Sequence, residues 1–256
     1  MIHPTALVST KARLGAGVSI GAYSIIGENV EIGENSTIGS HVVIDGHTSI
    51  GSENSIHPFC TLGGPPQDKK YRGEATRLEI GNRNTIREYC TANCGTIQDT
   101  GVTRIGDDNW IMAYVHIAHD CLIETDTIFA NNAQLAGHVN VGSHAILGGF
   151  TVVHQFVSIG AHSLTAMGTI LLQDLPPYVT AAGNTAQAHG INSEGLKRRG
   201  FSPESVAALR TAYKTLYKSG MTLADAKLDL ARQALVVPEI KVLVDFLEKS
   251  RRGIVR

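Results

Sequence analysis

Aliphatic residues recur at every sixth position through the first quarter of the chain. The series has eleven members without a miss: Ile2, Val8, Leu14, Ile20, Ile26, Ile32, Ile38, Ile44, Ile50, Ile56 and Leu62. A period of six fits neither the 3.6-residue repeat of an α-helix nor the two-residue repeat of a simple strand. It is typical of a hexapeptide solenoid, in which short strands and turns wind into a parallel β-helix.

A second series continues the pattern after two interruptions. The first series pauses near Asp68 and resumes at Ile80 and Ile86; a one-residue slip then precedes a run at six-residue spacing from Ile105 to Leu171, broken only by Thr165. We expect each aliphatic side chain to point into a narrow interior and stack on its copy in the next coil. Glycine usually follows the aliphatic residue, and we expect it to tolerate a turn backbone that a bulky residue would strain.

Three hexads close one triangular coil, so residues about 18 apart should lie one above the other. Successive coils should then be separated by the spacing of neighbouring strands, about 4.8 Å. The two phase breaks predict loops that leave the coil near residues 64–79 and 94–104. Loops on a rigid scaffold are where function usually lies.

Helical spacing replaces the hexads after about residue 185. Ser202 and Pro203 have the pattern of an N-cap followed by proline in the first turn, and this helix should end at Gly220. Thr222 should cap a second helix that ends near Gln233, and Pro238 should open a third that ends near Arg251. The sequence therefore predicts a mainly β chain: a β-helix over residues 1–186, then a small α-helical domain over residues 187–256.

Composition excludes several classes of function. The net charge of −1 gives no general signal for nucleic acid. We expect no signal peptide and no membrane span, and the four cysteines show no disulfide framework, which favours the reducing cytoplasm. The helical part carries a local basic cluster, which fits either a solvated helix face or a site for a phosphate or an acidic partner: Lys197, Arg198, Arg199, Arg210, Lys214 and Lys218.

Candidate chemistry is concentrated in three segments, HIAHDC (116–121), LAGH (135–138) and VHQF (153–156). The 18-residue spacing places His119, Gly137 and Gln155 in one column. His116, His138 and His154 are close to that column, so we expect four imidazoles to converge on one edge within three coils. A cluster of this kind indicates a site, whereas a single histidine is more often structural.

Two chemistries fit the histidine cluster. Three imidazoles can hold Zn²⁺ with an open position for water. Alternatively, Asp120 can orient a neutral His119 as a general base, provided that the two side chains converge in a turn. Gly137, one coil above His119, can present a bare backbone N–H to an oxyanion.

These three segments, together with PPQDKKY (65–71), QDLPPYV (173–179) and INSEGLKRRGFS (191–202), closely resemble the UDP-N-acetylglucosamine O-acyltransferase family, which begins lipid A biosynthesis. The resemblance covers essentially the whole chain. It implies a left-handed β-helix, an exception to the usual right-handed crossover, assembled as a homotrimer. It also implies transfer of a 3-hydroxyacyl group from acyl carrier protein to the 3-hydroxyl of UDP-N-acetylglucosamine, without cofactor or metal.

The resemblance also implies residue roles. His119 is the expected general base, Asp120 its partner, and the N–H of Gly137 the oxyanion donor, with no covalent intermediate. Positions expected to contact the sugar, nucleotide or acyl donor, partly from a neighbouring subunit, are Asp68, Lys70, His116, His138, His154, Gln155, Asn192, Glu194, Arg198 and Arg199. The basic cluster would steer the acidic carrier protein.

Two positions depart from the family pattern. Asn93, in TANCGT, stands where the family often has histidine. Met167, in TAMGT, is near the position that limits acyl length, where some members have glycine. Because extra volume in a packed slot is costly, we expect Met167 to favour a shorter acyl chain.

Three other functions are also compatible with the sequence. One is N-acyl transfer to UDP-3-O-acyl-glucosamine, a related later step; we expect this protein not to have the additional N-terminal domain of that enzyme. Another is a zinc-dependent lyase similar to the γ-class carbonic anhydrases. The third is a non-catalytic solenoid scaffold, which would not need the histidine column.

Overall fold

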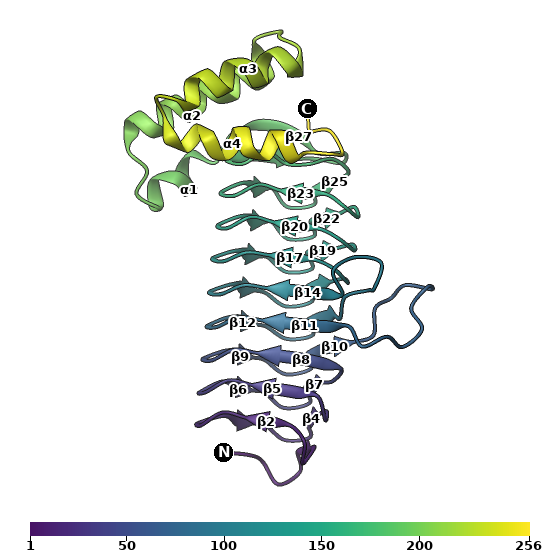
Figure 1. Cartoon of the computed structure of the whole chain (residues 1–256). Helices are drawn as coiled ribbons and strands as arrows, with labels where there is room; N and C mark the ends of the chain where they lie inside the picture. The colour runs from purple at the N-terminus through teal and green to yellow at the C-terminus, as the bar shows by residue number, and fades with distance from the viewer.

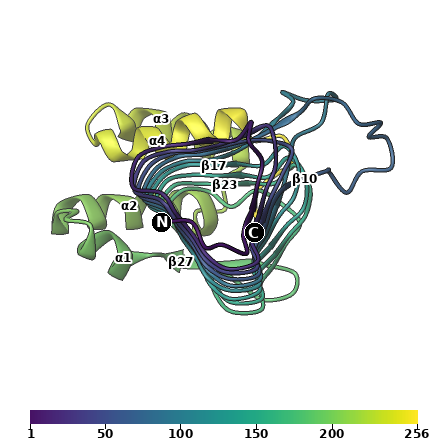
Figure 2. The ribbon, with the colours of Figure 1, turned by 90° about the horizontal axis from the view of Figure 1, so that it is seen from below.

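The computed structural model describes all residues 1–256 and shows a parallel β-helix closed at one end by helices (Figure 1). Three sheets, named A, B and C here, form the sides of a triangular prism (Figure 2), and their strands are parallel except for the last strand of sheet A, which pairs antiparallel with its neighbour. The chain passes from sheet B to sheet C to sheet A in every coil. The predicted β-helix and C-terminal helical region are therefore confirmed.

Each sheet is a ladder of very short strands. Sheet A contains β3 (Ser19–Ile20), β6 (Thr37–Ile38), β9 (Ser55–Ile56), β12 (Thr85–Ile86), β15 (Trp110–Ile111), β18 (Ile128–Phe129), β21 (Ile146–Leu147), β24 (Leu164–Thr165), β26 (Val179–Ala182) and β27 (Gln187–Ile191). Sheet B contains β1 (Leu7–Val8), β4 (Ile25–Ile26), β7 (Val43–Ile44), β10 (Thr61–Gly64), β13 (Thr91–Asn93), β16 (His116–Ile117), β19 (Gln134–Leu135), β22 (Val152–Val153) and β25 (Ile170–Leu171). Sheet C contains β2 (Arg13–Leu14), β5 (Val30–Ile32), β8 (His47–Ile50), β11 (Arg77–Ile80), β14 (Val102–Ile105), β17 (Leu122–Ile123), β20 (Asn140–Val141) and β23 (Ser158–Ile159).

Strands pair in the predicted 18-residue register, as at Ile117, Leu135 and Val153. The register is interrupted at two loops. Residues 65–76 connect β10 to β11, and residues 94–101 connect β13 to β14. Both loops leave the prism at the edge between sheets B and C, which is called the B–C edge below (Figure 2). The other two edges are the C–A edge and the A–B edge.

The interior of the prism is the stack of aliphatic residues that the six-residue period predicts. Forty-one buried residues form one hydrophobic cluster, and Ile44, Ile111 and Phe129 are fully buried. Thr165, the one break in the second series, is also buried. Its hydroxyl lies 2.7 Å from the hydroxyl of Thr151 and accepts a hydrogen bond from the Gly148 N–H at 3.0 Å. The polar atom is therefore satisfied inside the core.

The glycines that follow the aliphatic residues have a different role from the predicted one. Gly15, Gly21 and Gly33 do not have positive φ; the positive-φ residue of these turns comes two positions later and is usually not glycine. A Cβ at Gly21 would lie 2.6 Å from the carbonyl carbon of Gly39 in the next coil. Gly33 is limited in the same way by Gly51. The glycine is needed because successive coils approach too closely for a side chain, not because the turn backbone is strained.

The corners of the prism instead hold larger residues in the left-handed conformation. Asp120, His138 and Phe156 follow one another along the B–C edge with φ of 59°, 63° and 65°. Aromatic rings stack in the same manner along the A–B edge from Tyr23 to Tyr114. The repeated corner geometry places equivalent side chains directly over one another.

Four helices follow the β26–β27 hairpin: α1 (Ser193–Arg198), α2 (Pro203–Lys218), α3 (Leu223–Ala234) and α4 (Pro238–Lys249). The predicted caps are confirmed, because Ser202 and Thr222 accept hydrogen bonds from the Ser205 and Asp225 N–H groups. The short helix α1 was not predicted. None of the helices has the length and apolar character needed to cross a membrane. The helices form a second hydrophobic cluster and cover the end of the prism (Figure 1).

His162 lies where the prism meets the helical region, on the C–A edge. Its ring stacks on His144 and Tyr178 and meets Phe201 edge-on. Its Nδ1 atom is buried without a hydrogen-bond partner. Burial, with smaller contributions from the nearby charges of His144 and Arg199, lowers the pKa of His162 to about 4.

We expect the truncation Phe129→Ala to reduce the free energy of unfolding by about 3–5 kcal/mol, because it opens a cavity in a fully buried stack. Guanidinium denaturation at fixed protein concentration measures this loss. Asn140→Ala, on the exposed face of β20, is the control and should change the free energy by less than about 0.5 kcal/mol. Equal effects of the two substitutions would contradict the assigned core.

We expect the low pKa of His162 to make the fold less stable in mild acid. The unfolded chain binds a proton near the ordinary histidine pKa of 6.5, whereas folded His162 binds it only near 4. The free energy of unfolding should therefore fall as the pH falls through this window. His162→Gln removes this contribution, so the variant should lose less stability than the parent between the two pH values. Parallel pH dependences in both proteins would show that His162 is not held neutral.

Candidate active site

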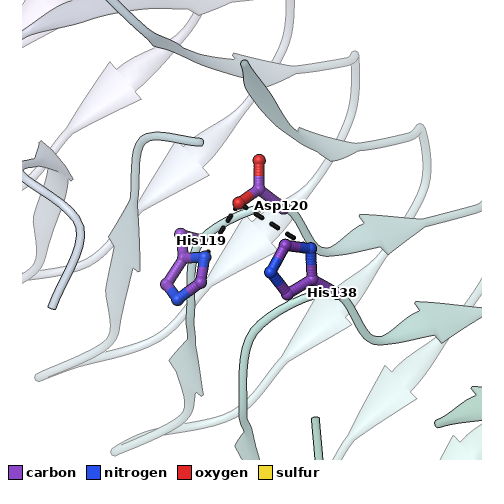
Figure 3. Close-up of side chains that lie close together, drawn as sticks. All are labelled: His119, Asp120 and His138. Atoms are coloured by element: carbon purple, nitrogen blue, oxygen red, sulfur yellow. Dashed lines mark hydrogen bonds and ion pairs between the residues drawn. The ribbon is translucent and has the colours of Figure 1, made fainter. Parts of the chain in front are cut away.

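His119 and Asp120 form a hydrogen-bonded pair in the turn between β16 and β17, at the B–C edge. The left-handed backbone of Asp120 turns its carboxylate back toward the preceding side chain, so that Oδ2 lies 2.8 Å from His119 Nδ1. In Figure 3 the other nitrogen of the His119 ring points away from Asp120. The convergence in a turn is the geometry that the general-base interpretation requires.

The carboxylate of Asp120 is fixed from several directions. Its side chain is 0% exposed. Thr96, in the 94–101 loop, donates its backbone N–H to Oδ1 at 2.8 Å and its hydroxyl to Oδ2 at 2.7 Å. The Asp120 N–H is accepted by the Thr103 hydroxyl at 2.8 Å. Burial by itself raises the pKa of Asp120, but the hydrogen bonds from His119 and Thr96 outweigh it and hold the pKa below its ordinary value.

An ionised Asp120 determines which nitrogen of His119 carries the proton. The carboxylate accepts the Nδ1–H, so Nε2 keeps its lone pair. His119 Nε2 has no hydrogen-bond partner within the chain, and the side chain is 15% exposed. The pair therefore presents an oriented base to a ligand at the B–C edge.

Gly137 lies directly against the His119 ring in the next coil. A Cβ at this position would be 2.5 Å from His119 Cε1 and 2.7 Å from Nε2, so any side chain would displace the imidazole. The Gly137 N–H donates to no group of the chain; the N–H groups of His119 and Gln155, at the same turn position, are equally free. One unpaired donor is thus located beside the oriented base.

His138 is the second imidazole of the site. Its ring meets that of His119 edge-on, with centroids 5.1 Å apart, and stacks on Phe156 at 4.3 Å. Its Nδ1 lies 2.8 Å from Asp99 Oδ2 and 3.9 Å from Asp120 Oδ2 (Figure 3 shows the second contact). A groove of about 710 Å³ begins at Asp99, His138 and Phe156 and extends over sheet C to α4.

The other two histidines of the expected cluster are less closely joined to this pair. His116, on β16, has Nδ1 2.7 Å from the Thr91 hydroxyl. Burial, with a contribution from the neighbouring His119, lowers its pKa. His154 and Gln155 lie one coil further along the edge and are exposed, and neither forms a hydrogen bond to His119 or His138. The structure therefore contains a close pair of imidazoles with two neighbours along the edge.

Asp68 and Lys70 lie in the 65–76 loop, which leaves the prism at the same edge. Asp68 accepts a hydrogen bond from the Lys70 backbone N–H at 2.9 Å, and the Lys70 side chain is exposed and forms no hydrogen bond or ion pair. Asn93 connects the base of this loop to β13, because its amide donates to the Pro65 carbonyl at 2.9 Å. Asn93 in place of the expected histidine thus supports the loop and leaves the His119–Asp120 pair intact.

The remaining predicted site residues lie on other edges of the same chain. Asn192 caps α1 and donates to the His162 carbonyl at 3.1 Å, at the C–A edge. Arg199 is partly buried there, and its pKa is lowered by this burial against the opposing charge of Asp126. Glu194, paired with Lys197, and Arg198 are exposed on α1. Met167 is 79% exposed at the A–B edge. A single chain does not bring these residues to His119.

His119, Asp120 and His138 are also the set with the spacing of metal ligands, since one atom from each lies within 4.8 Å of the others. The set contains two imidazoles and a carboxylate instead of the three imidazoles considered from the sequence. Asp120 Oδ2 already accepts hydrogen bonds from Thr96 and His119, and Asp99 is paired with His138 Nδ1. A cation at the centre of this set would have to replace those hydrogen bonds.

Cys121, next to Asp120, is unsuited to act as a nucleophile. Burial raises the pKa of its thiol to about 12, and Sγ donates to the Ala136 carbonyl at 3.2 Å. The thiolate is the reactive form of cysteine, so this side chain is a structural one.

Three contacts of the site were not predicted from the sequence, those of Thr96, Asp99 and Thr103. Thr96 and Asp99 lie in a loop that departs from the six-residue period, so the 18-residue spacing cannot align them with Asp120 or His138. Phe156, in the segment VHQF, lies one coil above His138, and this place follows from the 18-residue spacing. The two loop residues therefore needed the structure, whereas the place of Phe156 did not.

The family model for domain 2 of UDP-N-acetylglucosamine O-acyltransferase matches residues 174–255, and the model for bacterial transferase hexapeptide repeats matches residues 11–46 and 103–137. The acyl-[acyl-carrier-protein]–UDP-N-acetylglucosamine O-acyltransferase of Thiobacillus denitrificans is 64% identical over 255 residues, which is 100% of this chain and 99% of that protein.

Solved structures agree with the sequence comparison. LpxA from Acinetobacter baumannii superposes with a TM-score of 0.97 at 46% identity, covering 100% of this chain and 99% of that one. UDP-N-acetylglucosamine O-acyltransferase from Moraxella catarrhalis gives a TM-score of 0.98 at 44% identity, with the same coverage. The fold is the left-handed β-helix that was expected. The chain therefore belongs to the acyl-[acyl-carrier-protein]–UDP-N-acetylglucosamine O-acyltransferase family.

Proposed function

We propose that this chain transfers a 3-hydroxyacyl group from acyl carrier protein to the 3-hydroxyl of UDP-N-acetylglucosamine, the first step of lipid A biosynthesis. The family relatives carry the name of the acyl-carrier-protein-dependent O-acyltransferase. The observation that carries the mechanism is the His119–Asp120 pair, which presents an unpaired Nε2 beside the free N–H of Gly137.

In this mechanism His119 Nε2 takes the proton of the sugar 3-hydroxyl as the oxygen attacks the thioester carbonyl. The negative charge that develops on the carbonyl oxygen is stabilised by the Gly137 N–H. The C–S bond then breaks, and the protonated His119 returns its proton to the departing thiolate of the carrier arm. Asp120 stabilises the imidazolium through the 2.8 Å contact to Nδ1. The buried, protonated thiol of Cys121 supports direct transfer without an acyl-enzyme.

Substrate contacts are proposed for the remaining residues of the B–C edge. His138 and His116 adjoin the base, and His154 and Gln155 continue the edge. The 65–76 loop, which carries Asp68 and Lys70, leaves the prism at the same edge. The imidazoles of His138, His116 and His154 are suited to bind the sugar hydroxyls. The exposed Lys70 is suited to a phosphate or to the donor.

The separation of the predicted site over different edges supports a homotrimer. Within one chain Asn192, Glu194, Arg198 and Arg199 lie at or near the C–A edge, and Met167 lies at the A–B edge. These residues can reach a substrate held at His119 only from a neighbouring copy. A three-fold arrangement of parallel prisms, in which the edge of one chain adjoins those of the next, would complete the site.

Recognition of the carrier protein is assigned to the helical region, which we propose as a second domain over residues 187–256 that follows the β-helix of residues 1–186. The helical region has a hydrophobic cluster of its own. Its basic residues face an acidic partner in this proposal: Lys197, Arg198, Arg210, Lys214 and Lys218. Four free, buried cysteines support a reducing cytoplasmic location.

The alternatives receive less support. The relatives are named for O-acyl transfer, so N-acyl transfer to a glucosamine nucleotide is not favoured. A scaffold has no need of a hydrogen-bonded His–Asp pair with a free nitrogen. Zinc chemistry is tested by metal analysis of the purified protein, in which one zinc per chain, lost in His119→Ala, would favour the lyase.

We expect His119→Ala to lower kcat by about 10²- to 10⁴-fold, because a positioned base is lost. The assay incubates UDP-N-acetylglucosamine with 3-hydroxyacyl carrier protein and detects the 3-O-acyl product by mass. His47→Ala, an exposed histidine on β8, is the matched control and should keep full activity. Retention of activity in His119→Ala would exclude the proposed base.

We expect Met167→Gly to shift the preferred donor toward longer 3-hydroxyacyl chains, because the substitution removes an exposed side chain proposed to close the acyl groove. Competition among carrier proteins of several chain lengths measures the preference as a ratio of kcat/KM values. The control is Leu228→Ala, at an exposed aliphatic residue on α3, and it should leave the ratio unchanged. Alanine is used because glycine at this position would destabilise the helix. An unaltered preference in Met167→Gly would reject its role in chain length.

A further inference from the structure

The 94–101 loop contacts the His138 imidazole and the carboxylate partner of His119. Near its start, Thr96 donates two hydrogen bonds to Asp120, the partner of His119. Three residues later, Asp99 Oδ2 lies 2.8 Å from His138 Nδ1. The Thr96 carbonyl accepts the N–H groups of Asp99 and Gly101 at 3.2 and 3.1 Å, which closes the loop on itself. One turn therefore holds the partners of both histidines at a fixed separation.

His138 is fixed on three sides, and only one polar atom of its ring remains open. Phe156 stacks against one face, His119 meets the ring edge-on, and Asp99 occupies Nδ1. The side chain is 14% exposed, and Nε2 has no hydrogen-bond partner. The ring thus has the same arrangement as His119: a carboxylate on Nδ1 and a free Nε2.

Asp99 also keeps His138 from competing with His119 for the carboxylate of Asp120. Asp120 Oδ2 lies 3.9 Å from His138 Nδ1, close enough to attract its proton if Asp99 were absent. That oxygen already accepts hydrogen bonds from His119 at 2.8 Å and from the Thr96 hydroxyl at 2.7 Å. A third donor would compete with His119 for the same atom. By taking the His138 Nδ1–H, Asp99 leaves Asp120 to the base.

We propose that Asp99 is a positioning residue for the reaction, which holds His138 in the Nδ1–H tautomer with Nε2 open as a hydrogen-bond acceptor for a substrate hydroxyl. The 94–101 loop, through Thr96 and Asp99, orients His119 and His138 as one unit. The effect on turnover rests on the proposed acyl transfer. The tautomer of His138 does not, because it is a property of the free protein.

The tautomer can be measured directly. In protein labelled with ¹⁵N-histidine, long-range ¹H–¹⁵N spectra distinguish a protonated from an unprotonated ring nitrogen, and the His138 signals are identified by their absence in His138→Gln. Above the ordinary pKa of histidine, we expect His138 to be protonated at Nδ1 in the parent protein. Asp99→Ala should allow a population protonated at Nε2. Asp99→Asn should preserve the Nδ1–H form, since the amide oxygen can still accept.

Kinetics give the second readout. We expect Asp99→Ala to lower kcat/KM by about 10- to 100-fold, the range found for partners that orient metal-binding histidines. Asp99→Asn should recover most of this loss. Gln98→Ala, at an exposed neighbour in the same loop without side-chain hydrogen bonds, is the control for loop integrity and should be unchanged in both readouts.

Two results would overturn the proposal. One is His138 protonated at Nε2 in the parent protein, and the other is an unchanged tautomer in a folded Asp99→Ala protein, as judged by circular dichroism. The expected tautomers in a protein that does not acylate UDP-N-acetylglucosamine would reject the proposed function and leave the assignment of Asp99 standing.

Discussion

The register between successive coils is the constraint on which the rest of the molecule depends. Each strand is only two to five residues long, so a strand has little stability by itself and is held by its copies above and below. Because pairing repeats every 18 residues outside the two loops, an apolar residue in one coil nearly always meets an apolar residue in the next, the exception being Thr165. The same register stacks the corner residues. Asp120, His138 and Phe156 lie together because each occupies one position of one corner in consecutive coils.

The site is built from the regular coils and from a loop that departs from the repeat. The regular coil supplies His119, Gly137 and His138 at fixed spacing on a stiff edge. The 94–101 loop, which leaves that edge one coil before Asp120 and two coils before His138, supplies hydrogen bonds to both residues. A rigid column and one closed loop together fix two imidazoles with little freedom to reorient. Such preorganisation is favourable for proton transfer because no ordering is required during the reaction.

The negative charge of Asp120 is stabilised by hydrogen bonds inside the protein instead of by solvent. Asp120 has no exposed side-chain surface, and a buried carboxylate without partners would be costly. Hydrogen bonds from Thr96 and His119 compensate for that cost and keep the carboxylate ionised. Glycine at position 137 then allows the imidazole to lie against the backbone of the next coil, where an N–H is free. The base and the proposed oxyanion donor are neighbours because of this close approach.

The sequence alone determined the solenoid, the core residues and the column containing His119, Gly137 and Gln155, because a period of six is a local pattern that fixes which residues share a face. It also determined the caps at Ser202 and Thr222, which depend only on neighbours in the chain. The role of the repeating glycines was predicted wrongly, because the close approach of the next coil is not visible in local sequence. Only the tertiary structure decided the contacts of Thr96 and Asp99, since the loop that carries them follows no period. It also decided that Arg199 lies on a different edge from His119, because the helical region that carries Arg199 follows no six-residue period.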